Sequence, residues 1–388
     1  MKKKVVIIHN IMAPYRFPLF AEIAKSEKID LEVWFLSESA KNRRWRIKEK
    51  IDLPFKYKVL PKIELNFFGK DLFTWIFSPT FPWKLLRSNY DVLISAGWLD
   101  FACQAGFIIS KILRKPYILW SESTANEPSW RRNLASLLVK TIVCHSDACL
   151  PTSTRAKKYL VSLGAKEKKN FIGISTIDID YFKKTSKLTF TQKSQLKKKL
   201  EIQNSRLILF VGQLIERKGV KFLLQAYQQA VNKLKNSDWG LLIVGYGPQQ
   251  EDLKILCKRQ KIKDVYFCGH VEIDEMPKMY GLADLFVLPS LEETFGLVIN
   301  EAMASGLPII TTNNVGSCLD LVNPGENGFV IPAGNVTELS NAIIKIISNP
   351  DLLSKMGKKS SEMINKFGPK DQAKSFLQAI NYVIKNKY

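Results

Sequence analysis

Short apolar runs alternate with amphipathic stretches along almost all of the 388-residue chain. The runs have the length of strands buried on both faces, and the stretches between them have helical periodicity. The runs lie at residues 5–8, 31–35, 92–96, 117–120 and 148–151 in the first half, and at residues 207–212, 241–245, 265–268, 285–288 and 308–311 in the second. This alternation predicts parallel sheets covered by helices.

A polar segment separates the two groups of strands. It consists of residues 176–184 and a following stretch rich in lysine and threonine. We interpret this whole segment as the linker between two domains. A chain of this length can form two domains with separate cores. We therefore predict an α/β fold with a Rossmann-like N-terminal domain over residues 1–185 and a C-terminal domain over residues 186–369.

The composition is that of a soluble globular protein with a large positive charge. Apolar residues make up 46% of the chain, charged residues make up 24%, and the net charge is +22. Residues 1–185 contain 32 basic and 17 acidic residues (+15), against 26 and 19 (+7) in the remainder. This excess predicts a polyanionic partner for the first half: an anionic membrane surface, a lipid-linked diphosphate or a nucleic acid. The apolar runs are too short to span a bilayer, so membrane association would be peripheral.

The six cysteines form no C-x-x-C pair and no metal-binding spacing with the three histidines. The apolar run in residues 1–9 is too short for a secretory signal and is interpreted as the first buried strand. We therefore expect buried free thiols and a cytoplasmic location.

The most informative segment is residues 289–308, with the sequence PSLEETFGLVINEAMASGLP. Glu293 precedes a predicted helix and Glu301 lies inside it. Gly296 allows close approach of backbone N–H groups, and a helix N-terminus favours an anion such as a diphosphate. Carboxylates on both sides of an anion site suit a ligand with sugars at both ends, such as a nucleotide-sugar. The alternative is an ordinary helix start with solvated acids.

This segment resembles the Glu-x7-Glu donor motif of the retaining family-4 glycosyltransferases. The resemblance extends in order over about residues 207–335. It implies the GT-B fold, in which two Rossmann-like domains face each other across a cleft, and a last helix (residues 370–388) that packs back on the first domain. It also implies sugar transfer from a nucleoside diphosphate without a metal ion or cofactor, with Glu301 on the ribose and Glu293 on the transferred sugar.

The segment from Gly212 to Gly219 resembles the phosphate-binding element of the same family. A strand, a glycine turn, cations and a helix start make a plausible phosphate pocket. The resemblance assigns Lys218 to the donor diphosphate, where it would stabilise the charge on the departing nucleotide. Gln213 replaces the usual arginine, so either Arg217 supplies the missing charge or the diphosphate is held more weakly. The remaining donor-binding predictions are Gly212, Val271, Thr294, Phe295, Gly296 and Leu297.

Two segments of the first half are candidates for the acceptor side. Pro14, Tyr15 and Arg16 follow the first strand and resemble a Pro-Tyr-Arg motif of enzymes that build cell-surface polysaccharides. Arg16 either contacts an acceptor phosphate or the donor diphosphate, or lies over its own helix. Glu122 stands where many relatives have a histidine near the reacting sugar, which leaves it to bind the donor sugar or orient the acceptor hydroxyl.

Residues 41–46 and 65–84 mix aromatic and basic side chains. If exposed, they would dock on anionic lipid; the alternative is that the aromatic residues belong to the core.

These observations together predict a retaining, metal-independent glycosyltransferase. Its donor would be a UDP- or GDP-sugar, and its acceptor a glycan or lipid-linked chain in capsule, O-antigen, lipopolysaccharide or exopolysaccharide synthesis. We place it in the cytoplasm or on the inner face of the membrane. A catalytically inactive nucleotide-sugar-binding protein is the main alternative, which Gln213 and Glu122 favour. No nucleic-acid motif is present.

Overall fold

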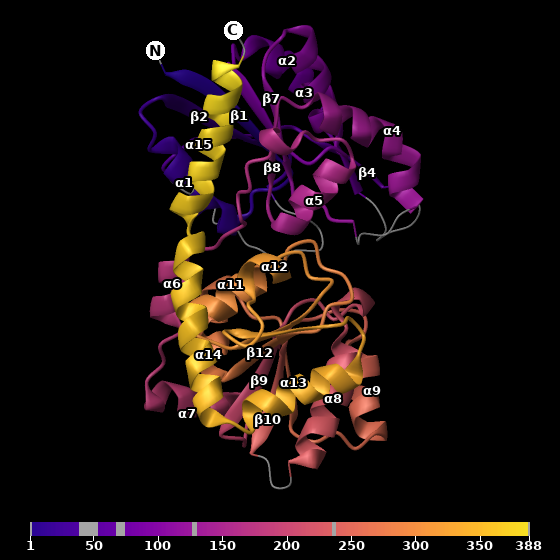
Figure 1. Ribbon diagram of the computed structural model, residues 1–388, viewed down its shortest axis with the longest axis vertical. Coiled ribbons are helices and arrows are strands. Elements are labelled where there is room, and N and C mark those ends of the chain that lie inside the picture. The colour runs from indigo at the N-terminus through magenta and orange to yellow at the C-terminus, as the bar shows by residue number, and fades with distance from the viewer. Residues whose placement is uncertain (1, 39–52, 67–73, 126–129, 235–237, 387–388) are drawn as a thin grey trace. The chain divides into compact units, whose positions relative to one another are not determined.

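The computed structural model describes residues 2–38, 53–66, 74–125, 130–234 and 238–386 (Figure 1). The chain divides into two compact units, each with its own core. The first unit consists of Met1–Thr176 with Pro369–Tyr388, and the second unit of Ile177–Gly368.

The first unit is built on a six-stranded parallel sheet in the order β3-β2-β1-β6-β7-β8. Its strands are β1 (Lys3–His9), β2 (Ile29–Phe35), β3 (Lys56–Val59), β6 (Val92–Ala96), β7 (Tyr117–Ser121) and β8 (Ala148–Pro151). An antiparallel pair, β4 (Ile63–Asn66) and β5 (Thr74–Phe77), lies outside this sheet. Numbered along the sheet's own strands, the order is 3-2-1-4-5-6, which is that of a Rossmann fold.

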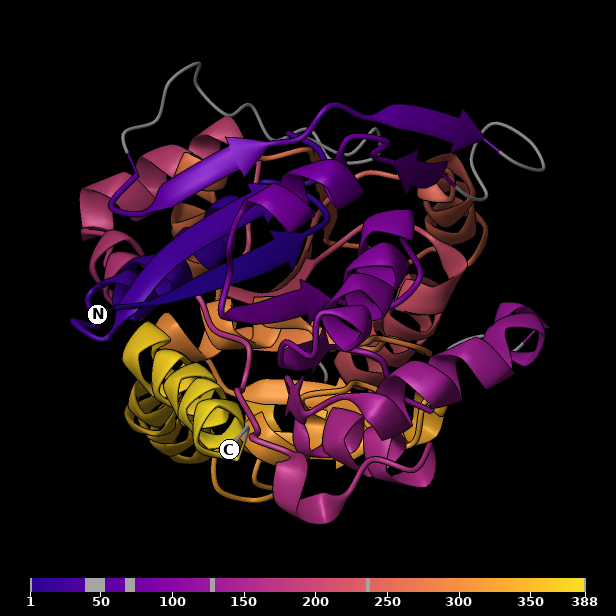
Figure 2. The same cartoon turned by 90° about the horizontal axis from the view of Figure 1, so that it is seen from above.

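Helices cover both faces of this sheet. Side chains alternate along β1, so that Val5 and Ile7 face one core cluster and Val6 and Ile8 face the other. The first cluster is covered by α1 (Phe17–Ala24) and α15 (Pro369–Lys385), the latter yellow in Figure 2. The second is covered by α2 (Phe81–Arg87), α3 (Phe101–Ile112), α4 (Trp130–His145) and α5 (Thr154–Ser162). Two 3-10 turns complete the unit, η1 (Pro14–Arg16) and η2 (Glu167–Lys169).

The second unit repeats this plan, with the strand order β11-β10-β9-β12-β13-β14. Its strands are β9 (Arg206–Val211), β10 (Trp239–Val244), β11 (Val265–Gly269), β12 (Leu285–Leu288), β13 (Ile309–Thr312) and β14 (Gly328–Ile331). Its helices are α6 (Ile179–Thr185), α7 (Phe190–Lys199), α8 (Val220–Lys233), α9 (Gln250–Arg259), α10 (Met276–Leu282), α11 (Leu297–Ala304), α12 (Cys318–Leu321), α13 (Val336–Ile347) and α14 (Pro350–Met363). Three 3-10 turns are η3 (Glu216–Lys218), η4 (Ile273–Glu275) and η5 (Ile364–Phe367).

The predicted fold class, α/β with two Rossmann-like domains, is confirmed, and all ten predicted strands are present. The interpretation of residues 176–184 as a linker is wrong. The chain passes between the units at Thr176 and Ile177, nine residues before the predicted boundary. Helix α6 belongs to the second unit because Ile179 and Phe182 are buried, and the ring of Phe182 lies 5.9 Å from that of Tyr280.

The structure places α15 on the first unit, although it follows the second along the chain. Four of its side chains, Phe376, Ala379, Ile380 and Val383, belong to the core cluster that contains β1 and α1. The ring of Phe376 meets that of Trp120 edge-on at a centroid distance of 5.0 Å. The last helix therefore closes one face of the first sheet.

The structure corrects one prediction about side-chain burial and divides the aromatic residues of another segment between its two alternatives. All six cysteines are free thiols and four are buried, but Cys268 is only partly buried and Cys144, on the outer side of α4, is exposed. In the segment 65–84, Phe81 is buried whereas Trp83, two residues further along α2, is 58% exposed. Residues 41–46 lie outside the described part of the chain. Among the described helices, none is both long and apolar enough to cross a bilayer.

Candidate functional site

The strand order of the second unit predicts where a ligand binds. In open parallel sheets, ligands bind beyond the carboxyl ends of the strands, at the point where the strand order reverses. In this sheet that point lies between β9 and β12, which are neighbours. Lys218 follows β9 and Glu293 follows β12, so the two predicted site residues flank the switch point.

A close backbone approach fixes the spacing of the two loops. Gly219 has φ +67°, and a Cβ at this position would lie 2.3 Å from the carbonyl oxygen of Pro289. Only glycine permits this approach without displacing one of the loops. The carbonyl of Arg217 then accepts hydrogen bonds from the N–H groups of Leu291 (2.8 Å) and Glu292 (3.2 Å). The loop after β9 is therefore clamped against the loop after β12.

Lys218 and Glu293 form a buried ion pair. Lys218 Nζ donates to Glu293 Oε2, and the two side chains are only 11% and 10% exposed. Arg217 Nη1 lies 3.9 Å from Glu293 Oε1, with its side chain 43% exposed. The loop after β13 adds backbone support, because Gly316 N–H donates to the carbonyl of Glu293 at 2.9 Å. Two cations thus converge on one carboxylate at the edge of the sheet.

The N-terminus of α11 lies directly after this carboxylate. Gly296, with φ +93°, occupies the N-cap position, and the helix runs from Leu297 to Ala304. Such a φ favours glycine over any side chain. Phe295 is buried and anchors the turn, while Thr294 and Leu297 retain some exposure. The positive end of the helix dipole and the cation of Lys218 therefore act at the same edge, an arrangement that suits an anion.

Glu301, in the second turn of α11, receives a hydrogen bond that the sequence does not predict. Tyr280 Oη donates to Glu301 Oε2 at 2.6 Å from the neighbouring helix α10. Burial raises the pKa of the Glu301 carboxyl to about 7, in spite of the lowering effect of the Tyr280 bond. Glu301 retains some accessible surface, and its second oxygen, Oε1, offers an acceptor for ligand hydroxyls.

The other predicted donor-site residues lie along the same edge of the sheet. Gly212 directly follows β9, and its N–H donates to Val244 O of β10 at 3.0 Å. Gln213 comes next and is partly buried. Val271 follows β11, which the strand order separates from β12 by β10 and β9. The cluster of Lys218, Arg217, Glu293 and the α11 N-terminus therefore lies nearest the switch point, with Val271 at its periphery.

In the first unit the structure brings together two residues that the sequence analysis treats separately. Arg16, in η1 after β1, is 2% exposed, and its Nη2 donates to Glu122 Oε1. Arg16 Nη1 also donates to Ser175 Oγ at 3.1 Å. The guanidinium carbon stands 4.9 Å from the ring centre of Trp120 and 5.0 Å from that of Tyr15. The alternative prediction, that Arg16 lies over its own helix, is therefore wrong.

Glu122 follows β7 at the carboxyl edge of the first sheet. Its side chain is 40% exposed, so the arginine holds one oxygen while the carboxylate remains open to solvent. A charge-assisted hydrogen bond from a buried arginine fixes the direction of this carboxylate. Glu122, oriented by Arg16, can therefore accept hydrogen bonds from hydroxyl groups at this edge.

Tyr280, Ser175 and Trp120 were not predicted from the sequence as residues near a site. Tyr280 and Glu301 are 21 residues apart on different helices, and Ser175 is 159 residues from Arg16. Neither separation leaves a local pattern. Trp120 ends the fourth predicted strand, and the abrupt change to polar residues after it could have marked it as a site neighbour. Within the described ranges, no group of three or more His, Cys, Asp or Glu side chains could hold a metal ion.

Comparison with known proteins identifies the second unit. Residues 192–363 match the family model described as glycosyl transferases group 1. An uncharacterized glycosyltransferase of Haemophilus influenzae is 36% identical over 173 residues. That alignment covers 44% of this chain and 48% of the relative, and so spans about half the length of the relative.

Solved structures extend the likeness to both units. HepE of Anabaena, in complex with UDP, has a TM-score of 0.75 at 18% identity and covers 98% of this chain and 100% of its own. The apo lipopolysaccharide outer core galactosyltransferase WaaB has a TM-score of 0.70 at 17% identity, with coverages of 97% and 99%. These neighbours establish the GT-B fold. The second unit contains a glycosyl transferases group 1 domain, in agreement with the resemblance read from residues 289–308.

Proposed function

We propose that the protein is a retaining glycosyltransferase that moves a sugar from a nucleoside diphosphate to an acceptor hydroxyl. The observation that carries this proposal is the buried Lys218–Glu293 pair beside the N-terminus of α11, at the switch point of a glycosyltransferase group 1 domain. An anion site flanked by carboxylates suits a diphosphate that bears a sugar on each side. The UDP bound by HepE supports a nucleotide donor of this kind.

Each side chain of the second-unit cluster has a role in this proposal. Lys218, Arg217 and the α11 N-terminus together neutralise the charge of the diphosphate. In this proposal they replace a metal ion. Lys218 Nζ has three N–H groups, of which one serves Glu293, so two remain for phosphate oxygens. Glu301 accepts hydrogen bonds from the ribose hydroxyls and Glu293 from hydroxyls of the transferred sugar. Gly212, Gln213 and Val271 line the edge where the nucleotide lies.

The proposed reaction exchanges one bond at the anomeric carbon. The acceptor oxygen attacks the carbon on the face from which the phosphate oxygen leaves, and the carbon–phosphate-oxygen bond breaks. The leaving phosphate accepts the proton of the acceptor hydroxyl, which gives a nucleoside diphosphate and a glycoside of unchanged anomeric configuration. Lys218 stabilises the negative charge that grows on the leaving group. Because this charge is larger in the transition state than in the ground state, the interaction lowers the barrier.

The first unit supplies the acceptor side in this proposal. Glu122, held by Arg16, orients the reacting hydroxyl or binds the donor sugar, and Tyr15 provides an aromatic wall next to Arg16. Because Glu122 already neutralises Arg16, we favour an acceptor hydroxyl over an acceptor phosphate at this position. We propose a glycan or lipid-linked acceptor in cell-surface polysaccharide synthesis, and a cytoplasmic protein attached peripherally to the membrane. The printed function of the neighbour WaaB supports this class of acceptor.

Product analysis with labelled donors tests the proposal. The purified chain is incubated with a panel of UDP- and GDP-sugars labelled in the sugar, with membrane lipid extract as acceptor. We expect one donor to yield a labelled glycoside with retained configuration and Glu293→Gln and Glu301→Gln to abolish its formation. Binding of a donor without any transfer would instead identify an inactive nucleotide-sugar-binding protein. Transfer that survives both substitutions would refute the site.

A further inference from the structure

Exposed large apolar side chains gather on one face of the first unit. Seven of the thirteen in the described residues belong to α2, α3 or α4 or directly follow α3: Trp83, Leu86, Ile108, Ile112, Leu113, Leu137 and Leu138. The three helices cover the same side of the first sheet, so their outer sides all point away from that side. We name this surface the α2–α4 face. A concentration of this kind on one face marks an interaction surface.

The opposite side of the same sheet provides an internal comparison. There, α1 and α15 contribute none of the large exposed apolar side chains among the described residues. The outer positions of α15 are instead polar, including Lys370, Asp371, Lys374 and Gln378. Helices on a sheet in a soluble protein are expected to be polar on their outer side, as α15 is. The α2–α4 face departs from this rule.

The charged residues in the sequences of these three helices are all basic. The 35 residues of the three helices contain six lysines and arginines and no aspartate or glutamate. Arg87 stacks on the ring of Trp83, with its guanidinium carbon 3.9 Å from the ring centre. Arg87 is exposed, as are Lys140 on α4 and Arg114, which lies just beyond the end of α3. The face therefore combines apolar side chains with exposed cations, and its three helices contain no acid.

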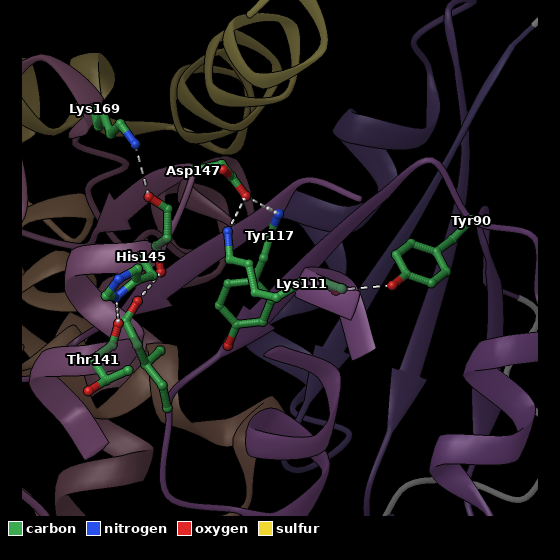
Figure 3. A network of polar contacts seen from close by, with 10 residues as sticks. Tyr90, Lys111, Tyr117, Thr141, His145, Asp147 and Lys169 are labelled. Atoms are coloured by element: carbon green, nitrogen blue, oxygen red, sulfur yellow. Dashed lines mark hydrogen bonds and ion pairs between the residues drawn. The ribbon is translucent and has the colours of Figure 1, made fainter. Parts of the chain in front are cut away.

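Asp147, which follows α4, is engaged in the framework that holds the helices. Figure 3 shows Lys111 of α3 directed to Asp147, which follows α4. Lys111 Nζ lies 2.9 Å from Asp147 Oδ2, and the same oxygen accepts Tyr117 N–H at 2.9 Å (Figure 3). This contact ties the carboxyl end of α3 to the end of α4 and to β7. Consequently, Asp147 holds the helices together and neutralises none of Arg87, Arg114 and Lys140.

We propose that the α2–α4 face docks on an anionic lipid surface, with Trp83 and the aliphatic side chains at the interface and the cations on the headgroups. A second copy of the chain fits less well, because an isologous contact would place cations against cations. A nucleic acid would satisfy the cations but not the exposed leucines and isoleucines. A lipid surface with anionic headgroups satisfies both, and tryptophan prefers this interface. This inference rests on the peripheral membrane location proposed above. It keeps Trp83 of the segment 65–84 in the docking surface and adds the exposed side chains of α3 and α4.

Vesicle flotation with the full chain tests the proposal. Vesicles of phosphatidylcholine alone are compared with vesicles that also contain phosphatidylglycerol. We expect binding to the anionic vesicles that weakens with salt and little binding to the neutral ones. The charge variant Arg87→Gln/Arg114→Gln/Lys140→Gln should bind about a hundredfold more weakly, at about fivefold for each charge. The apolar variant Trp83→Ser/Ile112→Ser/Leu137→Ser should bind at least about tenfold more weakly.

A matched control removes exposed apolar side chains elsewhere. Phe190→Ser/Ile255→Ser changes two side chains of the second unit that are 89% and 52% exposed, and should bind anionic vesicles like the native chain. Unchanged melting temperatures show that each variant is folded.

Equal binding by the native chain and the α2–α4 variants, or equal binding to both vesicle types, would overturn the proposal. So would a native dimer in ultracentrifugation that the apolar variant dissociates. Transfer to a water-soluble acceptor should survive in all variants, which separates this inference from the proposed reaction.

Discussion

At the scale of single residues, the protein is organised around two charge pairs that join distant parts of the sequence. Lys218 and Glu293 are 75 positions apart in the sequence, and Arg16 and Glu122 are 106 positions apart. In each pair the cation is largely buried, at 11% exposed for Lys218 and 2% for Arg16. A buried cation requires a fixed anionic partner, because the cost of desolvation is otherwise several kcal/mol. Each pair therefore fixes a side chain at the carboxyl edge of its sheet.

Removal of the carboxylate from the first pair should destabilise the protein. Glu122→Gln leaves the buried Arg16 without its charged partner, and we expect the free energy of unfolding to fall by about 1–2 kcal/mol. This figure lies below that of a fully buried pair because the Glu122 side chain is 40% exposed. Asp30→Asn breaks the exposed Lys56–Asp30 pair of the same unit and serves as the control, with a change below about 0.5 kcal/mol. Chemical denaturation measures both; equal effects would contradict the structural role of Arg16.

The raised pKa of Glu301 makes donor binding depend on pH. The ribose hydroxyls need an ionised acceptor, so the donor affinity should fall about tenfold per pH unit below pH 7 and level off above it. Tyr280→Phe removes a hydrogen bond that lowers this pKa, and should move the midpoint upward. Calorimetric titration of the donor between about pH 5.5 and 8.5 measures both midpoints. A pH-independent affinity would exclude Glu301 as an ionised ligand.

The Glu301 carboxyl also makes the stability of the fold depend on pH. Donor affinity should rise with pH, whereas the contribution of Glu301 to stability should fall. Between the ordinary carboxyl pKa of 4.5 and the folded value of about 7, the folded chain binds one proton more than the unfolded chain. The contribution of Glu301 to stability therefore falls as the pH rises through this window. Glu301→Gln should remove this part of the pH dependence.

At the level of elements, strands made of an uninterrupted apolar run were predictable, whatever their length, and an alternating strand or one that begins with glycine was not. Apolar runs such as those of β1, β9 and β12 need no context, because both faces of a parallel strand are buried. Strand β3, with the sequence KYKV, alternates and lies at the edge of the sheet, while β14 begins with glycine. Helix α6 was misread as a linker because its two buried side chains, Ile179 and Phe182, stand among charged residues. In these elements tertiary contacts decide the structure.

Helix α15 provides a prediction at this scale. Phe376 is fully buried in the first unit, against Trp120, although it lies beyond the whole second unit along the chain. Phe376→Ala should lower the free energy of unfolding by about 3–5 kcal/mol, because it leaves a cavity in the core. Gln378→Ala, two positions further on the exposed side, should change it by less than about 0.5 kcal/mol. Equal stabilities in chemical denaturation would show that α15 does not contribute to the core.

At the scale of the whole molecule, the same Rossmann plan appears in both units with different chemistry at its carboxyl edge. The second unit presents a lysine and a helix N-terminus at its switch point, which suits an anion. The first presents a carboxylate held by a buried arginine, which suits hydroxyls. The motif in residues 289–308 made the donor side predictable from the sequence. The pairing of Arg16 with Glu122 was not predictable, because no local pattern links residues from separate strands of a sheet.

We propose that the Lys218–Glu293 cluster holds the diphosphate of an activated sugar. The most direct measurement is the affinity of the native chain and of Lys218→Ala for the nucleoside diphosphate of the donor that the labelled panel identifies. We expect binding that weakens in Lys218→Ala, a transfer rate that falls by about 10²–10³, and a smaller effect for the more exposed Arg217→Gln. An affinity and a transfer rate unchanged by Lys218→Ala would contradict the account.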